Sequence, residues 1–245
     1  PQPYGEELDP EEVVGLEVKP PVVVNIAGDT LSFVPGSIGQ AARFDGHSFV
    51  DAGKVVPFDY LDSFSLGAWI YPTSADGAIL SSVTDQYQGQ GLGLYLRNGR
   101  LRVHFTKRWT DLGLRLETEK PLELNRWQHV LMTYDGKRKA EGLKLYVNGV
   151  SQRKRVLFDK MLWPMGGAES FRIGAGEGTG DRFQGYIDEV RVYRRMLSAE
   201  EAAVLVLRRT VSEIAASSPE ARSPAETNKL RFCFLDQYAP SEVEE

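Results

Sequence analysis

The stretch GLGLYLRNGRLRVHF, residues 91–105, decides the fold of this chain. Leucines alternate with small or polar residues before the central Asn98-Gly99 pair, and apolar residues alternate again after it. A period of two is typical of a half-buried strand. An Asn-Gly pair between two such runs predicts a tight hairpin, because a type I′ turn needs a positive φ at both central residues.

The same pattern recurs elsewhere along the chain. Apolar residues alternate again in residues 143–147, directly before Asn148-Gly149, and also in residues 64–70. Between residues 22 and 193 no strand–helix–strand alternation occurs, so a parallel sheet is not expected. The sequence therefore predicts an all-β, mainly antiparallel architecture.

Helical signals are confined to the C-terminal part. Ser198 and Glu201 form the pattern of a capping box, and Ser223 and Glu226 repeat it with Pro224 at the first helical position. We therefore expect helices after each of these serines.

These patterns divide the chain into three parts. Residues 1–22 are rich in Pro and Glu and are expected to be a linker or an extended N-terminal segment. Residues 23–197 are expected to form the β-sandwich, and residues 198–245 a helical extension that packs on it. The chain starts at Pro1 rather than Met, which we interpret as a sign of a fragment from a longer protein.

Composition argues against several classes of function. The net charge is −5, whereas a nucleic-acid-binding protein needs a basic surface; the Lys137-Arg138-Lys139 cluster is interpreted as a solvated loop tip. No apolar run reaches the roughly 20 residues that span a bilayer, so no membrane insertion is expected. The single cysteine, Cys233, allows no disulfide within the chain and is interpreted as structural.

Four strings of the sequence resemble the laminin G-like branch of the concanavalin A-like jelly rolls. Together they fall within residues 31–205, and they are ARFDG (42–46) with FV (49–50); FSLGAWIYP (64–72); WQHV (127–130) with TYD (133–135) and LYVNG (145–149); and FRIG (171–174) with FQGYIDEVRVY (183–193). The resemblance implies a two-sheet antiparallel jelly-roll sandwich. It also implies that ligands bind at the concave face or at the rim loops.

The C-terminal piece is similar to helical segments found beside laminin G-like domains in large bacterial multidomain proteins that carry a cytochrome c module. This resemblance implies that the other domains of a parent chain are partners. It also implies a periplasmic or secreted location.

A catalytic site is not expected. Related jelly-roll glucanases carry alternating acids of the type Glu-x-Asp-x-Glu, which alternation places on one face of a strand. The one match, Glu7-Leu8-Asp9-Pro10-Glu11, contains a proline that disfavours a central strand. Asp188 and Glu189 are adjacent, so their side chains should point to opposite faces.

A structural calcium ion is a further expectation, and it rests on the resemblance. In similar jelly rolls the ion is held by the Asp of the late strand and by carbonyl groups of the early Asp-Gly turn, which correspond to Asp188 and to Asp45 with Gly46. The alternative is that Asp188 accepts hydrogen bonds from turn amides or pairs with Arg191.

Three aromatic residues in loops or near a strand end are candidates for ligand binding: Tyr87, Trp109 and Trp163. The alternative for each is a ring that covers the core. Trp69 and Trp127, by contrast, are expected to fill the core between the sheets.

The sequence thus predicts a non-catalytic recognition module of a larger exported protein, with a carbohydrate or a protein partner as its ligand. Two alternatives stay open. One is a glycoside hydrolase or lyase with an unusual site, and the other is a structural spacer domain.

Overall fold

The computed structural model describes residues 25–27, 31–55, 58–84, 88–164, 169–176 and 181–238. The described residues up to Leu197 belong to one compact unit, and those from Ser198 onward belong to a second. The segment 1–22, expected to be a linker, lies outside the described residues.

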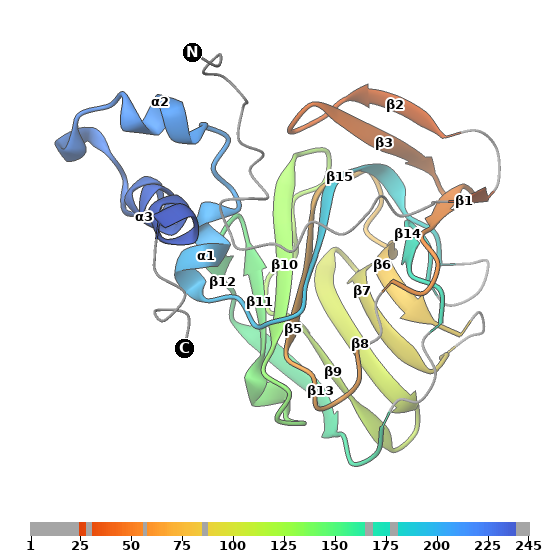
Figure 1. Cartoon of the computed structure of the whole chain (residues 1–245). Coiled ribbons are helices and arrows are strands. Elements are labelled where there is room, and N and C mark those ends of the chain that lie inside the picture. The colour runs from red at the N-terminus through yellow and green to blue at the C-terminus, as the bar shows by residue number, and fades with distance from the viewer. Residues whose placement is uncertain are drawn as a thin grey trace. The chain divides into compact units, whose positions relative to one another are not determined.

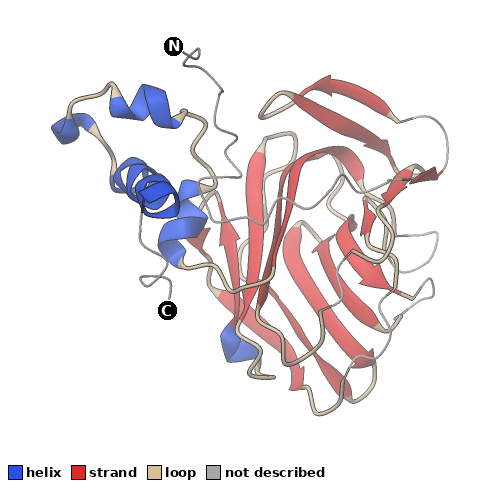
Figure 2. Ribbon diagram, in the orientation of Figure 1, coloured by secondary structure: helices blue, strands red, loops and turns tan. Residues whose placement is uncertain are grey.

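The first unit is an antiparallel sandwich of two sheets, as predicted (Figures 1 and 2). Among the described residues, one sheet has eight strands in the order β1 (Asn25–Ala27), β4 (Phe49–Asp51), β14 (Arg172–Ile173), β6 (Gly77–Val83), β7 (Gly91–Arg97), β8 (Arg100–Arg108), β9 (Leu112–Thr118) and β13 (Lys154–Lys160). The other has seven in the order β12 (Val150–Ser151), β11 (Leu143–Val147), β10 (Gln128–Tyr134), β5 (Phe64–Pro72), β15 (Gln184–Tyr193), β3 (Gln40–Asp45) and β2 (Ser32–Pro35).

The core lies between the inner faces of the two sheets. Alternating residues of the central strands supply it, including Leu66, Ala68, Ile70, Leu92, Leu94, Leu96, Leu101, Val103, Phe105, Val130 and Met132. Burying each leucine contributes about 1.5–3 kcal/mol. A slip of one residue would turn a whole strand's apolar set to solvent, so the alternation fixes the register.

Both Asn-Gly hairpins are confirmed. Asn98 and Gly99 have φ values of 50° and 73° between β7 and β8, and Asn148 and Gly149 have 50° and 74° between β11 and β12. Positive φ at both central residues is the geometry of a type I′ turn, whose twist matches that of the flanking strands.

The expectation that Trp69 and Trp127 fill the inter-sheet core is wrong. Leu66, Ala68 and Ile70 of β5 point into the core, so Trp69 points to the opposite face, where it lies against the ring of His129. Trp127 is half-buried and packs on Tyr71. Strict alternation from the core residues of β5 would have given the correct face for Trp69.

The second unit is helical, with α1 (Ala199–Val204), α2 (Val211–Ala215), the short 3-10 helix η3 (Pro219–Ala221) and α3 (Pro224–Tyr238). The capping boxes of Ser198 with Glu201 and of Ser223 with Glu226 are formed as predicted. The helix α2 was not predicted, although Thr210 and Glu213 form the same capping-box pattern. None of the helices among the described residues has the length and apolar character needed to cross a membrane.

Candidate functional site

The outer face of the eight-stranded sheet carries a layer of polar and aromatic side chains. Along β7, β8 and β9 these residues alternate with core residues and so point away from the core, and the residues of β13 join them through pairing with β9. We call the layer the arginine face; it consists of Tyr95, Arg97, Arg100, Arg102, His104, Trp109, Arg115, Glu117, Arg155 and Phe158.

Strand register sets the neighbours within this layer. Tyr95, Arg102, Glu117 and Arg155 lie opposite one another in one row across four strands. The next row contains Gly93, His104, Arg115 and Phe158. Two residues of strand separate the rows, which is roughly 7 Å.

The aromatic rings of the arginine face are in contact with guanidinium groups. The Arg115 guanidinium lies 4.0 Å from the ring centre of Trp109 and 4.7 Å from that of Phe158. Arg97 lies 4.7 Å from the ring centre of Tyr95. Cation–π contacts of this kind contribute about 0.5–2 kcal/mol and hold a flexible side chain in place.

One buried carboxylate, Glu117, binds several of the arginines. Arg102 donates to it through Nε at 2.8 Å and through a second nitrogen, Arg155 donates to its other oxygen, and Arg100 Nε lies 3.8 Å away. Burial acts to raise the pKa of Glu117, but the hydrogen bonds and charges of Arg102 and Arg155 outweigh it, so the pKa is lowered. Glu117 is therefore a fixed anion rather than a proton donor.

A second carboxylate reaches the face from a connecting loop. Asp181 pairs with Arg97 at 2.7 Å. A Cβ atom on Gly176 would lie 2.6 Å from the Asp181 carboxylate and 2.7 Å from the Tyr95 ring, so only glycine permits this close approach. Loop and sheet are thus packed together at Tyr95.

The charge of this layer differs in sign from that of the whole chain. Within β7, β8, β9 and β13 the outward positions hold Arg97, Arg100, Arg102, Arg115, Arg155 and Lys160 but a single carboxylate, Glu117. Asp181 is added by the loop. The described part of the face is therefore strongly cationic, although the chain has a net charge of −5.

Two of the three predicted ligand residues lie at one end of this sheet. Trp109 is in the turn between β8 and β9, where it is half-buried between His104, with ring centres 4.9 Å apart, and Arg115. Trp163 follows β13 and is 61% exposed. Lys160 pairs with Gly113, so the end of β13 lies beside the start of β9. Tyr87 lies outside the described residues.

The arginines and Phe158 were missed by the sequence analysis. Alternation between core leucines marks Arg102 and Arg115 as outward-facing, so this part of the signal was present. The pairing of β13 with β9, which brings Arg155 and Phe158 to the same face, depends on tertiary contacts between distant segments.

The structure places the residues of the predicted calcium site apart. Asp45 lies opposite Gln184 on β15, and Asp188 is four residues further along that strand, roughly 13 Å away. The Asp45 carboxylate accepts the N–H groups of His47 and Ser48, each at 2.9 Å, and these hydrogen bonds lower its pKa. Gly46 donates to the carbonyl group of Phe183 at 3.1 Å. The calcium site stays a prediction, and chelation tests it.

Asp188 instead ties β15 to a loop. Its Oδ2 accepts the N–H of Ile38 at 2.9 Å, and burial raises the pKa of its carboxyl group. This matches the alternative stated above, in which Asp188 accepts hydrogen bonds from turn amides. Among the described residues, no three His, Cys, Asp or Glu side chains gather closely enough to hold a metal ion.

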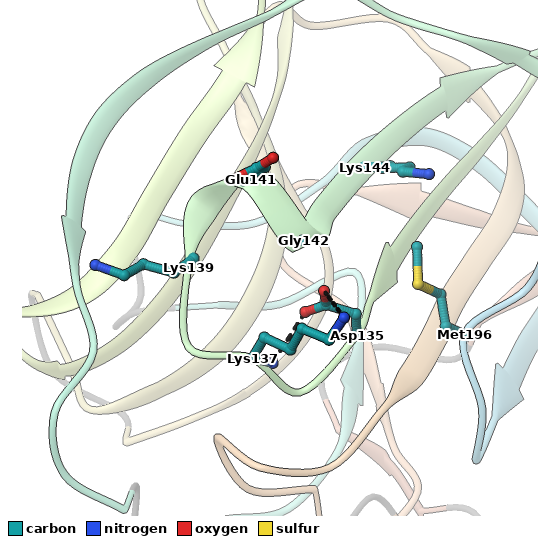
Figure 3. Close-up of a pocket in the computed structure, with 7 residues that line it drawn as sticks. All are labelled: Asp135, Lys137, Lys139, Glu141, Gly142, Lys144 and Met196. Carbon is teal, nitrogen blue, oxygen red and sulfur yellow. Dashed lines mark hydrogen bonds and ion pairs between the residues drawn. The ribbon is translucent and has the colours of Figure 1, made fainter.

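A shallow pocket of about 390 Å³ lies on the other side of the sandwich, at one end of the seven-stranded sheet (Figure 3). It is lined by Asp135, Lys137, Lys139, Glu141, Gly142, Lys144 and Met196. Asp135 accepts the N–H of Lys137 at 2.9 Å, and the side chain of Lys139 points away from this pair in Figure 3. The lining has no aromatic ring and its charges are mixed, so the pocket is a weaker candidate than the arginine face.

Three further aromatic rings form a half-buried cluster on the outer face of the seven-stranded sheet. Tyr71, Trp127 and Tyr186 have ring centres 5.5–6.3 Å apart. These rings lie on the sheet opposite the arginine face and are far from it in the strand order.

Comparison with known families and structures agrees with the architecture. The Laminin_G_3 family model, described as concanavalin A-like lectin/glucanases superfamily, matches residues 44–203. Domain 4 of AbnA, a GH43 extracellular arabinanase from Geobacillus stearothermophilus solved in complex with arabinotriose, has a TM-score of 0.50 and 19% identity, covering 75% of this chain and 88% of that one.

Two toxin binding domains have similar folds. The binding domain of Paraclostridial Mosquitocidal Protein 1 has a TM-score of 0.55 and 18% identity, covering 75% of this chain and 47% of that one. The binding domain of botulinum neurotoxin serotype G has a TM-score of 0.53 and 15% identity, with 76% and 46% covered. At these identities the similarity establishes the fold.

Proposed function

We propose, from the fact that the chain belongs to the concanavalin A-like lectin/glucanase superfamily, that it is a non-catalytic module that binds carbohydrate through the arginine face. The observation that carries the proposal is the composition of that face. An ordered layer of hydrogen-bond donors and aromatic rings covers a sheet surface that the core does not use. Sugar sites combine such rings with a few polar groups that fix orientation.

The comparisons support this proposal at the level of the fold. The arabinanase domain of similar fold was solved with arabinotriose, and the two toxin domains are binding domains. Fold similarity alone does not identify the ligand of this chain, so the proposal depends on the residues of the arginine face.

Binding rather than catalysis is supported by the state of the carboxylates. A glycosidase needs one carboxyl group with a raised pKa as the acid. The pKa of Glu117 is lowered, and Asp181 is paired with Arg97. The rival reading as a hydrolase or lyase would gain from polysaccharide turnover that Glu117→Gln or Asp181→Asn abolishes while the fold is kept.

A glycan array, followed by calorimetry on the glycans it identifies, tests the proposal. We expect binding that Arg102→Gln or Trp109→Ala weakens at least about tenfold, because each removes charge-assisted hydrogen bonds or packing at the face. Trp127→Ala, in the cluster on the other sheet, is the matched aromatic control and should leave affinity unchanged.

Two results would contradict the proposal. An array without any binding, together with tight binding to other domains of the parent chain, would favour the spacer or a protein-binding role. Loss of binding in Trp127→Ala but not in the arginine-face variants would move the site to the seven-stranded sheet.

The module's wider context is part of the same proposal. We place it in a larger exported protein, periplasmic or secreted, whose other domains include a cytochrome c module. Haem staining and cell fractionation of the intact parent protein test this placement, and a cytoplasmic parent chain without haem would contradict it.

A further inference from the structure

We propose that the arginine face selects acidic saccharides, glycans that bear carboxylate or sulfate groups, with Arg102, Arg115 and Arg155 as the groups that contact the anion. This inference rests on the proposed function and names its ligand class. It starts from the excess of arginines over carboxylates on the described part of the face.

The use of the aromatic rings favours an anionic ligand over a neutral one. A neutral sugar stacks on an open ring face, whereas the faces of Trp109 and Phe158 are in contact with the guanidinium of Arg115. Tyr95 is fully buried and lies beneath Arg97. The ring faces in contact with guanidinium groups thus position cations.

Stacking of this kind prepares Arg115 for an anion. The flat faces of a guanidinium rest on the rings, and its N–H groups, which lie in the plane, are directed sideways. Because Trp109 and Phe158 already restrict the side chain, binding loses less conformational entropy than with a freely rotating arginine. A planar carboxylate matches the guanidinium fork with two parallel hydrogen bonds.

The cluster around Glu117 supplies the second part of the site. Arg100, Arg102 and Arg155 surround a single carboxylate, which neutralises one of their three charges. Their side chains remain 25%, 23% and 52% exposed, so a ligand can reach them from solvent. A carboxylate or sulfate of the ligand would neutralise positive charge of the arginines that Glu117 does not neutralise.

A purely structural network is the competing explanation, and it accounts for Arg102 and Arg155 but not for Arg100. Arg155 lies on the edge strand β13 and is half exposed, whereas its partner Glu117 is buried. Arg102 donates both of its hydrogen bonds to Oε2 of Glu117, and Arg155 donates to Oε1. Arg100, whose Nε lies 3.8 Å from Glu117, adds a positive charge that these hydrogen bonds do not require, and an external anion accounts for it.

Calorimetry with matched saccharides tests the inference on the full chain. The probes are a galacturonate hexasaccharide, the same hexasaccharide as its full methyl ester, a sulfated galactan fragment and its desulfated form. We expect each acidic form to bind at least about tenfold more tightly than its neutral counterpart, as one charge-assisted hydrogen-bond pair provides. Binding should weaken as salt is raised.

Variants locate the effect. Arg155→Gln and Arg115→Gln should each remove most of the preference for the acidic form, with melting temperatures recorded to show that the fold is kept. Arg126→Gln is the matched control: Arg126 is an exposed arginine paired with Glu123, outside the arginine face, and its variant should bind like the parent.

The outcomes separate this inference from the proposed function. Equal binding of acidic and neutral forms would overturn the inference and leave carbohydrate binding in place, whereas binding of no saccharide, on these probes or on the array, would overturn both. A preference for acidic forms that survives Arg155→Gln and Arg115→Gln would overturn the assignment to this face. Tighter binding of a single-stranded oligonucleotide than of any acidic saccharide would show that the face recognises nucleic acid instead.

Discussion

His129 is a buried histidine in the seven-stranded sheet. It lies on β10 with its ring against Trp69, and its Nδ1 is buried without a hydrogen-bond partner within the described residues. Burial, helped by the positive charge of Arg191, lowers the pKa of His129 to about 3. The folded protein therefore holds this histidine neutral at pH values where an unfolded chain would protonate it.

The pH dependence of stability follows from this difference. The unfolded chain takes up a proton at His129 below about pH 6.5, and the folded chain does so only near pH 3. In that window the unfolded state binds more protons, so the free energy of unfolding falls as pH falls, by up to about 1.4 kcal/mol per pH unit. Urea denaturation from neutral pH down to about pH 5, above most carboxylate titrations, measures the slope.

His129→Gln should reduce this slope, because the side chain no longer titrates. His47, which is exposed, provides the control, and His47→Gln should leave the slope largely as it is in the parent. A slope that is unchanged in His129→Gln would contradict the assignment to His129.

The turn of the β7–β8 hairpin is held both by its own sequence and by hydrogen bonds to other segments. Gly99 adopts a φ of 73°, donates its N–H to the carbonyl group of Ala75 and accepts the N–H of Leu122 at 2.7 Å. The turn is thus fixed both by its own sequence and by two neighbouring connections.

Gly99→Ala should destabilise the protein by about 1–2 kcal/mol, because a Cβ is disfavoured at positive φ. The added atom would also lie 3.2 Å from Cβ of Pro121. Asn98→Gly, at the preceding position with a φ of 50°, is the control and should change stability by less, since glycine tolerates this conformation. Chemical denaturation compares the two, and an equal loss in both would argue against backbone strain as the cause.

At the scale of the whole molecule, Asp188 links segments 150 residues apart through its hydrogen bond with Ile38. A Cβ on Gly36 would lie 2.5 Å from the same carboxylate oxygen, so the loop approaches β15 closely. The hydrogen bond therefore joins the end of the sandwich to its beginning.

Asp188→Ala should cost about 1–3 kcal/mol, because the N–H of Ile38 would lose its acceptor in a largely buried setting. Asp188→Asn keeps an acceptor oxygen and should cost less. Prolonged chelation should leave the melting temperature of the parent unchanged. A melting temperature that falls on chelation, with no such response in Asp188→Asn, would restore the calcium site expected from the resemblance.

The fold class could be predicted from the sequence, because the sequence signals for strands, turns and helix starts are local. Alternation of period two sets the faces of β7 and β8, Asn98-Gly99 sets their turn, and Ser198 with Glu201 sets the start of α1. Each signal acts over fewer than about ten residues, so no knowledge of distant contacts is needed.

The residues of the candidate site could not be predicted from the sequence, because long-range strand pairing brings them together. Arg115 lies between Trp109 and Phe158 because β13 pairs with β9, and no local pattern encodes that pairing. The calcium site stays a prediction: the right residue types are present, and the register of β15 against β3 places Asp188 away from Asp45. Local chemistry therefore specified the strands, and their long-range register specified which side chains meet.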